Sequence, residues 1–302
     1  MKDTIIRIKS ISQLCEQSGF GKPTHPLIHI VDVSKWAIGP EQIGIRYTSE
    51  LYTIALKDKS CGIQYGRNSY DFDEGVMMFT APNQVVSSTK EQKLNEIQGW
   101  MLFFHPDLIR HTTLGAEMDK YSFFSYDVHE ALHLSKKEQQ TITDIVDKIQ
   151  EEVLERIDNH SNRVIVAGLE LLLSYAWRYY ERQFNTRKAA NSDVVSQVET
   201  LLKEYYDAAG FLNSGMPSGV YFAEKVHLSS HYLSDLMKKE TGLGLKDYIN
   251  AFVVEKAKTL LLTSSDSVSG IAYTLGFNYP HYFSRLFRSK TGLTPSEYRE
   301  LN

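Results

Sequence analysis

Cysteine is scarce in this sequence, and long apolar runs are missing. Only two cysteines, Cys15 and Cys61, occur in 302 residues, too few for a disulfide framework or a four-cysteine zinc site. No window reaches the roughly 18 apolar residues that a membrane-spanning helix needs. The N-terminus has no uninterrupted apolar core of the signal-peptide type. These absences predict a cytoplasmic protein without a membrane partner.

Most motifs of catalytic sites are missing as well. There is no P-loop, no glycine-rich dinucleotide fingerprint, no Gly-x-Ser-x-Gly and no His-x-His pair of a metal cupin strand. The stretch HEALH, residues 129–133, matches the zinc motif H-E-x-x-H, but it ends two residues before a predicted helix cap at Ser135. We interpret it as a chance match. The sequence therefore predicts no catalytic residue, no metal site and no cofactor.

Negative charge is in excess, but it is unevenly distributed. The formal net charge is −4. From Pro217 to Asn302 there are ten Lys and Arg against eight Asp and Glu, whereas the rest of the chain has 23 against 29. A C-terminal segment of positive charge in an acidic protein is a modest indication of a nucleic-acid partner and carries little weight alone.

The N-terminal part alternates short strand patterns with turns. Between Pro26 and Pro106, runs rich in β-branched and aromatic residues are separated by turn residues, which predicts an antiparallel sandwich or barrel. The runs are LIHIVDV, QIGIRYTSELYTIALKD, SCGIQYG, EGVMMFTAP and QGWMLFFHP.

Two groups of side chains in this region invite a chemical interpretation. The segment YDFDEG, residues 70–75, is interpreted as an acidic turn between strands in preference to a cation site. Inward-facing side chains such as Tyr47, Trp100 and Phe103 would line a pocket or fill a core. Because both alternatives stay open, no effector-binding residue is assigned.

After Leu134 the apolar period becomes helical. A helix over residues 135–157 begins at an N-cap, Ser135, and a second helix runs from about Arg163 to Gln183. The apolar stripe of the second helix fits either a core or a dimer seam beside the barrel. The polar stretch NTRKAANSD, residues 185–193, is the predicted linker. The dimerisation residues assigned to the stripe are Ile165, Leu169, Leu172, Leu173 and Ala176.

The C-terminal third contains an internal repeat. HYLSDLMKKETGL, residues 231–243, is followed fifty positions later by HYFSRLFRSKTGL, residues 281–293. Five residues further on, Tyr248 matches Tyr298. Two copies are too few for a solenoid, so the pattern indicates a small helical unit that occurs twice.

Each copy is preceded by a helical pattern and a turn. In the second copy Gly276 lies where a residue with positive φ ends a helix, Asn278 can cap the next helix, and Pro280 is tolerated in its first turn. In the first copy His227 takes the turn position, and the turn is one residue shorter. Small residues where two helices must cross closely occupy matching positions, Ala223 and Ala272.

Helix, turn and helix in this order define the helix-turn-helix, whose second helix presents its N-terminal part to DNA base edges. Arg285 can bond guanine bidentately and Arg288 can neutralise phosphate, whereas Asp235 can accept from cytosine N4 but repels phosphate. Tyr232 and Tyr282 are expected to pack partly inward or to meet the phosphate backbone, and core packing is the preferred alternative. The predicted DNA-binding residues are His231, Ser234, Asp235, Lys238 and Lys239 in the first copy, and His281, Ser284, Arg285 and Arg288 in the second. The two histidines could instead be structural residues of the first helical turn.

Between the copies, residues 245–262 predict one continuous helix of roughly 27 Å. Two recognition helices in successive major grooves lie about 34 Å apart, so a rigid connecting helix suits this spacing. Thr294-Pro295-Ser296-Glu297 is a capping box that opens a last short helix. The inward residues expected of the connecting helix are Tyr248, Phe252, Ala257, Leu260 and Leu261.

The segment from about Ser218 to Arg299 resembles the DNA-binding domain of the AraC/XylS family of bacterial transcription regulators. IAYTLGFNYPHYFSRLFRSKTGLTPSEYR, the preceding AKTLLL and the first-copy YLSDLMKKETG carry the resemblance. It implies an N-terminal sensing domain, often a cupin-like β-barrel, followed by helices used in dimerisation. Asp235 and Val253 depart from the family, which commonly has Arg at both places. We therefore predict that the second helix-turn-helix contributes the larger share of affinity.

The predicted fold class is multidomain β + α, in which a cupin-like β-barrel with a helical extension precedes an all-α domain with two helix-turn-helix motifs. The predicted domains are 1–133, a sensor or effector domain; 134–184, a helical dimerisation region; 185–193, a linker; and 194–302, an AraC-type DNA-binding domain. Within the last, the first motif covers about 218–241, the connecting helix 245–262 and the second motif about 267–290.

Three functions are compatible with these observations. The first is a sequence-specific transcription regulator, with double-stranded DNA, a small-molecule effector, a second copy of the chain and, for an activator, RNA polymerase as its partners. The second is a metal-dependent cupin-like enzyme fused to a helical domain. The third is an architectural DNA binder without an effector, whose affinity would barely depend on sequence.

Overall fold

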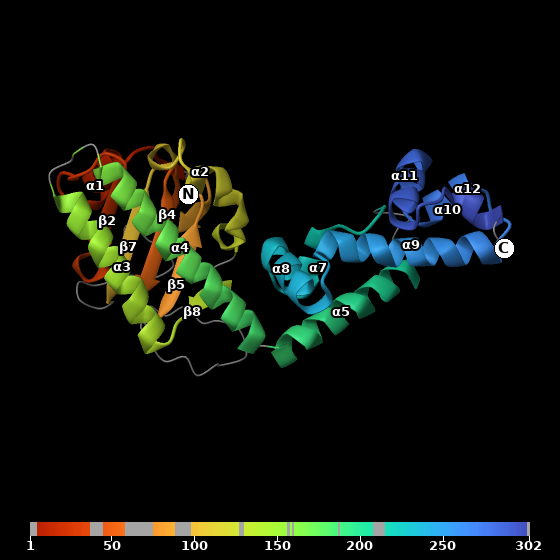
Figure 1. Ribbon diagram of the computed structural model, residues 1–302. Helices are drawn as coiled ribbons and strands as arrows, with labels where there is room; N and C mark the ends of the chain where they lie inside the picture. The colour runs from red at the N-terminus through yellow and green to blue at the C-terminus, as the bar shows by residue number, and fades with distance from the viewer. Residues whose placement is uncertain are drawn as a thin grey trace. The chain divides into compact units, whose positions relative to one another are not determined.

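The computed structural model describes residues 5–36, 45–57, 75–87, 98–126, 130–155, 158, 160–186, 188–207 and 215–300 (Figure 1). The chain divides into two compact units, Met1–Asn185 and Thr186–Asn302. The first is β-rich with two long helices, and the regular elements of the second, within its described residues, are all helices. The β-rich region and the helical C-terminal domain predicted from the sequence are therefore confirmed.

The larger sheet of the first unit has five antiparallel strands in the order β2-β7-β4-β5-β8. Four of these strands lie in runs that the sequence predicted, and β8 was missed because it is only two residues long. The strands are β2 (Ile28–Asp32), β4 (Tyr52–Lys57), β5 (Val76–Thr80), β7 (Gly99–Phe104) and β8 (Leu132–His133).

A smaller sheet has the order β1-β3-β6. Strand β1 (Ile5–Ile8) runs parallel to β3 (Arg46–Ser49), which pairs antiparallel with β6 (Val85–Ser87). The strand pairs of the described residues form these two sheets and do not close into a barrel. Short helices complete the unit: α1 (Ile11–Ser18), η1 (Val33–Lys35), η4 (Pro106–Leu108), α2 (Thr113–Glu117), η5 (Met118–Lys120) and η6 (Ser122–Ser125).

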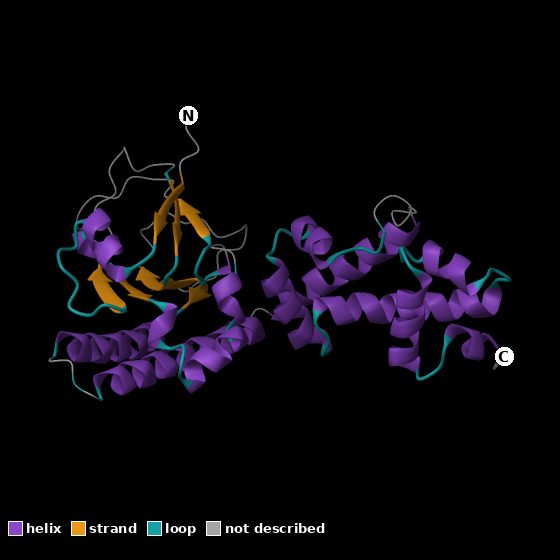
Figure 2. Cartoon of the chain, turned by 90° about the horizontal axis from the view of Figure 1, so that it is seen from above, coloured by secondary structure: helices purple, strands orange, loops and turns teal. Residues whose placement is uncertain are grey.

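Two long helices, α3 (Lys136–Leu154) and α4 (Ser161–Thr186), form a layer on one face of the larger sheet (Figures 1 and 2). The predicted capping box at Ser135 is confirmed, because the Ser135 hydroxyl accepts from the Glu138 N–H and the Glu138 carboxylate accepts from the Ser135 N–H. Trp100 points toward this layer and donates its indole N–H to Thr143 Oγ1 at 3.4 Å. Of the inward side chains expected to line a pocket or fill a core, Trp100 therefore belongs to the core.

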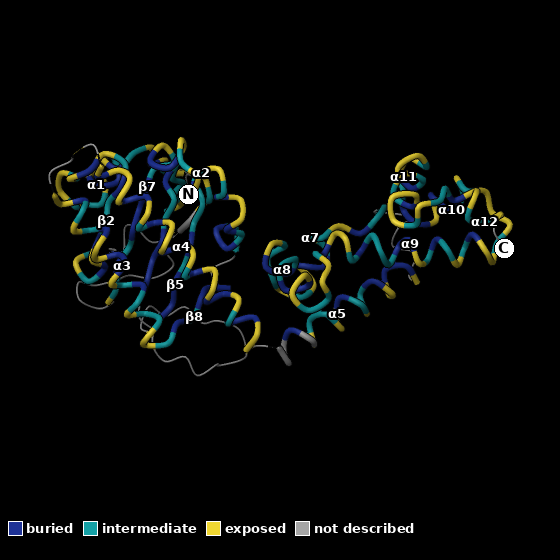
Figure 3. Tube along the Cα trace, in the orientation of Figure 1, coloured by how far each residue is buried: buried dark blue, intermediate teal, exposed yellow. Residues whose placement is uncertain are grey.

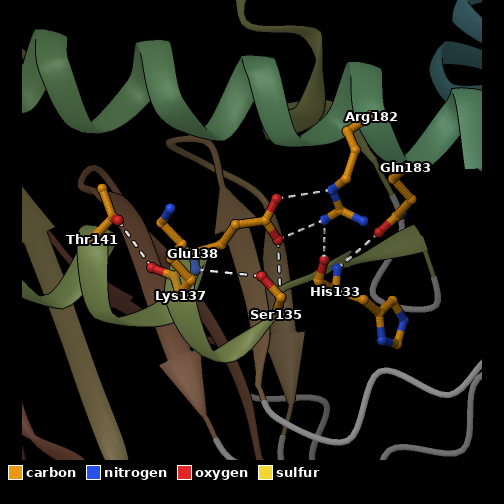
Figure 4. A network of polar contacts seen from close by, with 7 residues as sticks. All are labelled: His133, Ser135, Lys137, Glu138, Thr141, Arg182 and Gln183. Atoms are coloured by element: carbon orange, nitrogen blue, oxygen red, sulfur yellow. Dashed lines mark hydrogen bonds and ion pairs between the residues drawn. The ribbon is translucent and has the colours of Figure 1, made fainter.

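A polar network fastens β8 to both long helices (Figure 4). Arg182 of α4 pairs with Glu138 of α3 at 2.9 Å and donates to the His133 carbonyl at 2.7 Å. The buried Gln183 amide accepts from the His133 N–H at 2.8 Å and donates to the Ala131 carbonyl at 3.2 Å. These bonds satisfy the free edge of a short strand, which would otherwise leave backbone groups unpaired.

Strand β8 contains the last two residues of the H-E-x-x-H match. His133 lies in β8 and not on a helix, so the helical geometry of that zinc motif is absent there; His129 lies outside the described residues. Residues 70–74 of the predicted acidic turn also lie outside them. Across the described ranges, no three His, Cys, Asp or Glu side chains gather in a way that could hold a metal ion. No helix of those ranges has the length and apolar character to cross a membrane.

The apolar stripe of α4 that the sequence assigned to dimerisation is buried inside the first unit. Since these side chains fill the protomer's own core, they are not available to a second copy, and the core alternative is the correct one. The helical period of the stripe was predicted correctly. The period alone does not show whether an apolar face packs in the protomer's own core or against a second protomer. The buried residues are Ile165, Leu169, Leu172, Leu173 and Ala176.

The second unit begins inside the predicted linker. Residues 188–193 are helical and open α5, so the polar composition of residues 185–193 did not mark a loop. One core joins α5 to all the following helices through side chains such as Leu202, Tyr206 and Phe222. The helices are α5 (Lys188–Asp207), α7 (Gly219–Lys225), α8 (Ser230–Thr241), α9 (Leu245–Thr263), α10 (Val268–Thr274), α11 (Pro280–Thr291) and α12 (Pro295–Glu300).

Candidate nucleic-acid interface

The same turn is built twice, between α7 and α8 and between α10 and α11. In the first copy the Leu228 N–H donates to the Ala223 carbonyl at 2.9 Å, and in the second the Phe277 N–H donates to the Ala272 carbonyl at 3.0 Å. Both alanines are buried, as expected where two helices cross closely. The matched hydrogen bonds confirm that the sequence repeat is a structural repeat.

A left-handed residue stands at the same place in both turns. His227 has a φ of 56° and Gly276 a φ of 87°, as the sequence predicted for both. A Cβ on Gly276 would lie 2.7 Å from the Gly215 carbonyl carbon and from the Met216 nitrogen, so only glycine fits there. The Tyr205 hydroxyl holds the opposing segment by donating to the Gly215 carbonyl at 2.8 Å.

The two recognition helices, α8 and α11, begin differently. The Ser229 hydroxyl caps α8 by accepting from the Tyr232 N–H at 3.2 Å. The N-cap of α11 is Tyr279, without a side-chain hydrogen bond, and Pro280 occupies the first turn. The predicted cap at Asn278 is therefore wrong by one residue. Proline at the first position supplies a preset φ and has no N–H to satisfy, which reduces the need for a capping side chain.

Both recognition helices end in the same way, which explains the repeated Thr-Gly-Leu. Gly242 and Gly292 have φ values of 78° and 81°. Thr241 Oγ1 donates to the Met237 carbonyl at 2.7 Å, and Thr291 Oγ1 donates to the Phe287 carbonyl at 2.8 Å. Each threonine hydroxyl also accepts from the N–H of the leucine two residues later, at 3.2 Å. The motif is thus a helix stop.

Helix α9 connects the two copies, with α7 and α8 at its N-terminal end and α10 to α12 toward its C-terminal end (Figure 1). Its 19 residues, Leu245–Thr263, correspond to roughly 28 Å. Buried residues recur along the helix from Leu245 to Leu261 (Figure 3), and Val253 is fully enclosed in the core. An arginine at that position would have to bury its charge, so the departure from the family is a core substitution here. Of the five residues predicted inward, Ala257 and Leu261 are buried, while Tyr248, Phe252 and Leu260 pack half-buried against the core.

Side-chain bonds fix both ends of α9 to the rest of the unit. The Tyr248 hydroxyl lies 2.6 Å from Glu199 Oε1 of α5. Burial and this hydrogen bond raise the pKa of Tyr248 to about 12. Arg299 of α12 donates to the Leu261 carbonyl at 3.1 Å, near the C-terminal end of α9. The predicted capping box of α12 is confirmed by bonds between Thr294 and Glu297 in both directions.

The exposed face of α8 carries three of the five predicted first-copy residues. His231, Lys238 and Lys239 are exposed, and Ser234 and Asp235 are half-buried. The Ser234 hydroxyl accepts from the Leu245 N–H at 3.3 Å, which ties α8 to the start of α9. Ser234 therefore has a structural role in addition to any contact with DNA.

On α11 the predicted residues are more open. His281, Arg285 and Arg288 are exposed and Ser284 is half-buried, while Phe283 and Phe287 fill the core beneath them. Ser284 cannot repeat the bond made by Ser234, because Pro295 replaces Leu245 and has no N–H.

Sequence reasoning misplaced Tyr282. Tyr232 is buried as expected, but its repeat partner Tyr282 is 47% exposed. Helix α8 packs against α5 as well as α9, and α5 precedes only the first copy. The environment of the two tyrosines therefore differs although the local pattern is the same, and the repeat alignment alone could not reveal this.

Comparison with known proteins agrees with this architecture. The helix-turn-helix domain family matches residues 222–301. The chain is 28% identical over 167 residues to an uncharacterized HTH-type transcriptional regulator, YijO, of Escherichia coli, covering 55% of each chain. It is 26% identical over 196 residues to the melibiose operon regulatory protein of Escherichia coli, covering 65% of this chain and 61% of that one. The chain thus spans about half the length of the curated relatives it matches.

Among solved structures, the C-terminal domain of the two-component response regulator yesN from Fusobacterium nucleatum matches with a TM-score of 0.32 and 33% identity. The match covers 35% of this chain and 98% of that domain.

Two helix-turn-helix motifs joined by one helix, each with an exposed second helix, define the C-terminal unit as a tandem helix-turn-helix domain. Residues 222–301 are an AraC-type helix-turn-helix domain, and the resemblance to the AraC/XylS family is confirmed for this part of the chain.

Proposed function

We propose that the protein is a cytoplasmic, sequence-specific transcription regulator that reads two successive major grooves with α8 and α11. The observation that carries the proposal is the duplicated helix-turn-helix, with matched turns and matched helix stops on a common connecting helix. The relatives named as transcriptional regulators support the same function. If the protein activates transcription, RNA polymerase is a further partner.

The charges on the two recognition helices suit a DNA surface. Lys238 and Lys239 lie in the last turn of α8 and Arg288 in that of α11, so both helices present exposed cations there, whereas Lys290 pairs with Asp247 of α9 at 3.1 Å. Such groups neutralise phosphates irrespective of sequence, whereas the exposed Arg285 in the middle of α11 can pair with a base edge. The unit therefore offers both an anchor to the backbone and a group that reads sequence.

Selection of genomic DNA fragments on the purified full chain tests the proposal. A recurrent motif with two half-elements about one helical turn apart is expected, bound roughly 10³-fold or more tightly than random DNA. Recovery of DNA without any recurrent motif would favour the architectural alternative. An absence of DNA binding together with stoichiometric metal in the purified protein would favour the enzyme alternative.

Effector control is proposed to act through a cavity of about 240 Å³ in the first unit. Alternate residues of the larger sheet form one wall, where Met78 and Met101 flank the small Ala55, and Thr53 lies beside Thr80 in the next row. Side chains from the smaller sheet and α1 complete the lining. This enclosure supports a compact, largely apolar small molecule with a hydrogen-bonding group as effector, within a cupin-like sensing domain.

Filling the cavity should abolish the response to such an effector. In the wild type, a small molecule that raises the melting temperature is expected to change the affinity for the selected DNA as well. In Ala55→Leu the leucine side chain projects into the space between the methionines. This variant is expected to lose both the rise in melting temperature and the change in DNA affinity. Ala116→Leu on the exposed face of α2, outside the cavity lining, is the matched control. A molecule that stabilises Ala55→Leu as much as the wild type would place the effector site elsewhere.

A homodimer is also proposed, through the face of α4 opposite the buried stripe. Val164 and Leu171 are about half exposed, and Ala167 lies between them at helical spacing. Arg163 and Glu170 flank this stripe two turns apart. In an antiparallel pair, Arg163 of each protomer can therefore face Glu170 of its partner.

Leu171→Glu should disrupt this dimer because it buries two like charges at the contact. Sedimentation of the full chain is expected to show a dimer for the wild type and a monomer for the variant, with unchanged thermal unfolding of the first unit. Trp177→Glu is the control, since Trp177 is also exposed but packs on Tyr121 away from the stripe. Equal dimerisation of the wild type and Leu171→Glu would rule out this surface.

A further inference from the structure

The start of α11 carries a cluster of exposed rings. Tyr279, His281 and Tyr282 are all exposed, and their ring centroids lie between 4.1 and 6.0 Å apart. Exposed aromatic rings that contact one another at the N-terminal turn of a recognition helix are unusual for a surface without a partner. The cluster stands on the part of the helix that a helix-turn-helix presents to DNA.

Arg285 contacts this cluster through Tyr282. Its guanidinium carbon lies 5.2 Å from the centroid of the Tyr282 ring, three residues earlier on the same face of the helix. A guanidinium held by the face of a ring uses its charge for that contact and keeps its N–H donors for other acceptors. The ring therefore reduces the number of conformers that Arg285 must abandon on binding.

The first copy lacks this arrangement at the equivalent positions. Tyr232 is buried in the core, Asp235 replaces the arginine, and the Ser234 hydroxyl is engaged by the Leu245 N–H. Its exposed cations, Lys238 and Lys239, lie in the last turn, where they suit phosphates better than base edges. The two helices share a fold and an exposed histidine, His231 or His281, but only α11 has the arginine and the exposed ring beside it.

We infer that Tyr282 is a positioning residue for Arg285, which holds the guanidinium ready for bidentate bonding to a guanine, so that α11 reads sequence while α8 mainly anchors the domain to the DNA backbone. The inference rests on the proposed function and assigns unequal tasks to the two recognition helices. Base preference is then concentrated in the half-element under α11.

Paired substitutions at Tyr282 test the inference. Tyr282→Phe keeps the ring, and Tyr282→Leu removes it while leaving an apolar side chain of helical propensity. The guanine is located as the base pair at which Arg285→Ala loses discrimination. For each variant two quantities are measured: discrimination between the preferred site and the same site with that guanine replaced, and affinity for random duplex DNA. Tyr273→Leu, another exposed tyrosine of the same motif, is the control.

Tyr282→Leu is expected to lower discrimination at the guanine by about two- to fivefold, the range of an exposed cation–π contact. Affinity for random DNA should stay unchanged, and Tyr282→Phe and Tyr273→Leu should behave like the wild type. In an Arg285→Ala background, Tyr282→Leu should have no further effect on discrimination, because the group that it positions is gone. A role in helix stability alone would not produce this dependence.

Two results would overturn the inference while leaving the proposed function intact. The first is unchanged discrimination in Tyr282→Leu. The second is an equal loss of affinity for all sequences in Tyr282→Phe and Tyr282→Leu, which would make the tyrosine hydroxyl a phosphate contact. A wild-type protein that prefers no sequence would instead contradict the proposed function itself, and the inference with it.

Discussion

Arg285→Ala is expected to weaken binding to the preferred DNA site by about tenfold or more, since a bidentate arginine–guanine pair contributes about 1–3 kcal/mol of discrimination. Arg285 is exposed and its contact is with the Tyr282 ring on the same surface, so its removal leaves the core untouched. Affinity for random DNA and its salt dependence should change little, because Arg285 is assigned to a base edge and not to a phosphate. Titrations on the preferred and a scrambled duplex measure both effects.

The matched comparison lies in the first copy, where Asp235 occupies the place of Arg285. Asp235→Ala combined with Ser234→Ala is expected to cost less binding than Arg285→Ala, because an aspartate near phosphates opposes binding. Since Ser234 also bonds the start of α9, thermal unfolding of this double variant must be measured alongside. A larger loss in the first-copy variant than in Arg285→Ala would contradict the assignment of the greater share of affinity to the second motif.

Gly276→Ala is expected to destabilise the C-terminal unit by about 2–5 kcal/mol, the sum of a left-handed residue with a side chain and an overpacked contact. The φ of 87° is one part, and the approach of the new Cβ to the backbone of Gly215 and Met216 at 2.7 Å is the other. Rotation of a side chain cannot relieve a contact with backbone. Hydrogen exchange of the amides in α10 and α11 measures the loss within the full chain.

The repeat supplies controls for this substitution. Gly242 and Gly292 have nearly the same φ, 78° and 81°, but a Cβ on either meets nothing within 4 Å. Gly292→Ala and Gly242→Ala should therefore cost only about 1–2 kcal/mol, from the backbone conformation alone. If all three variants were equally destabilised, the close packing of the turn of the second motif on residues 215 and 216 would not matter for stability.

The C-terminal unit was predictable from the sequence because its signals are local. Caps, positive-φ residues and helical periods lie within a few positions of one another, and two copies allow each to be checked against the other. His227, Gly276 and the capping box at Thr294 were all placed correctly. Where the cap at Asn278 was misplaced, the error was one residue, since a proline in the first turn makes the cap side chain dispensable.

The errors arose where tertiary packing decides between two local alternatives. The apolar stripe that begins at Ile165 packs in the protomer's own core. A helical period cannot distinguish such a core face from a dimer face. Tyr232 and Tyr282 occupy matching positions of the repeat, but α5 precedes only the first copy. Residues 188–193 look like a linker because their polar composition is typical of a loop, although they form the first turns of α5.

Helices α8 and α11 of one chain are proposed to bind two successive major grooves. The most direct test of this proposal varies the distance between the two half-elements of the selected DNA site. Half-elements are moved apart by two, five and ten base pairs, and affinity is measured for each duplex. Because α9 is one continuous helix with its inner side in the core, it fixes the distance between the motifs, and affinity should be highest at the selected spacing. It should fall to that of a single half-element at about five base pairs, and an insertion of about ten, a full turn, should not restore it. Affinity that does not depend on the spacing would contradict the account.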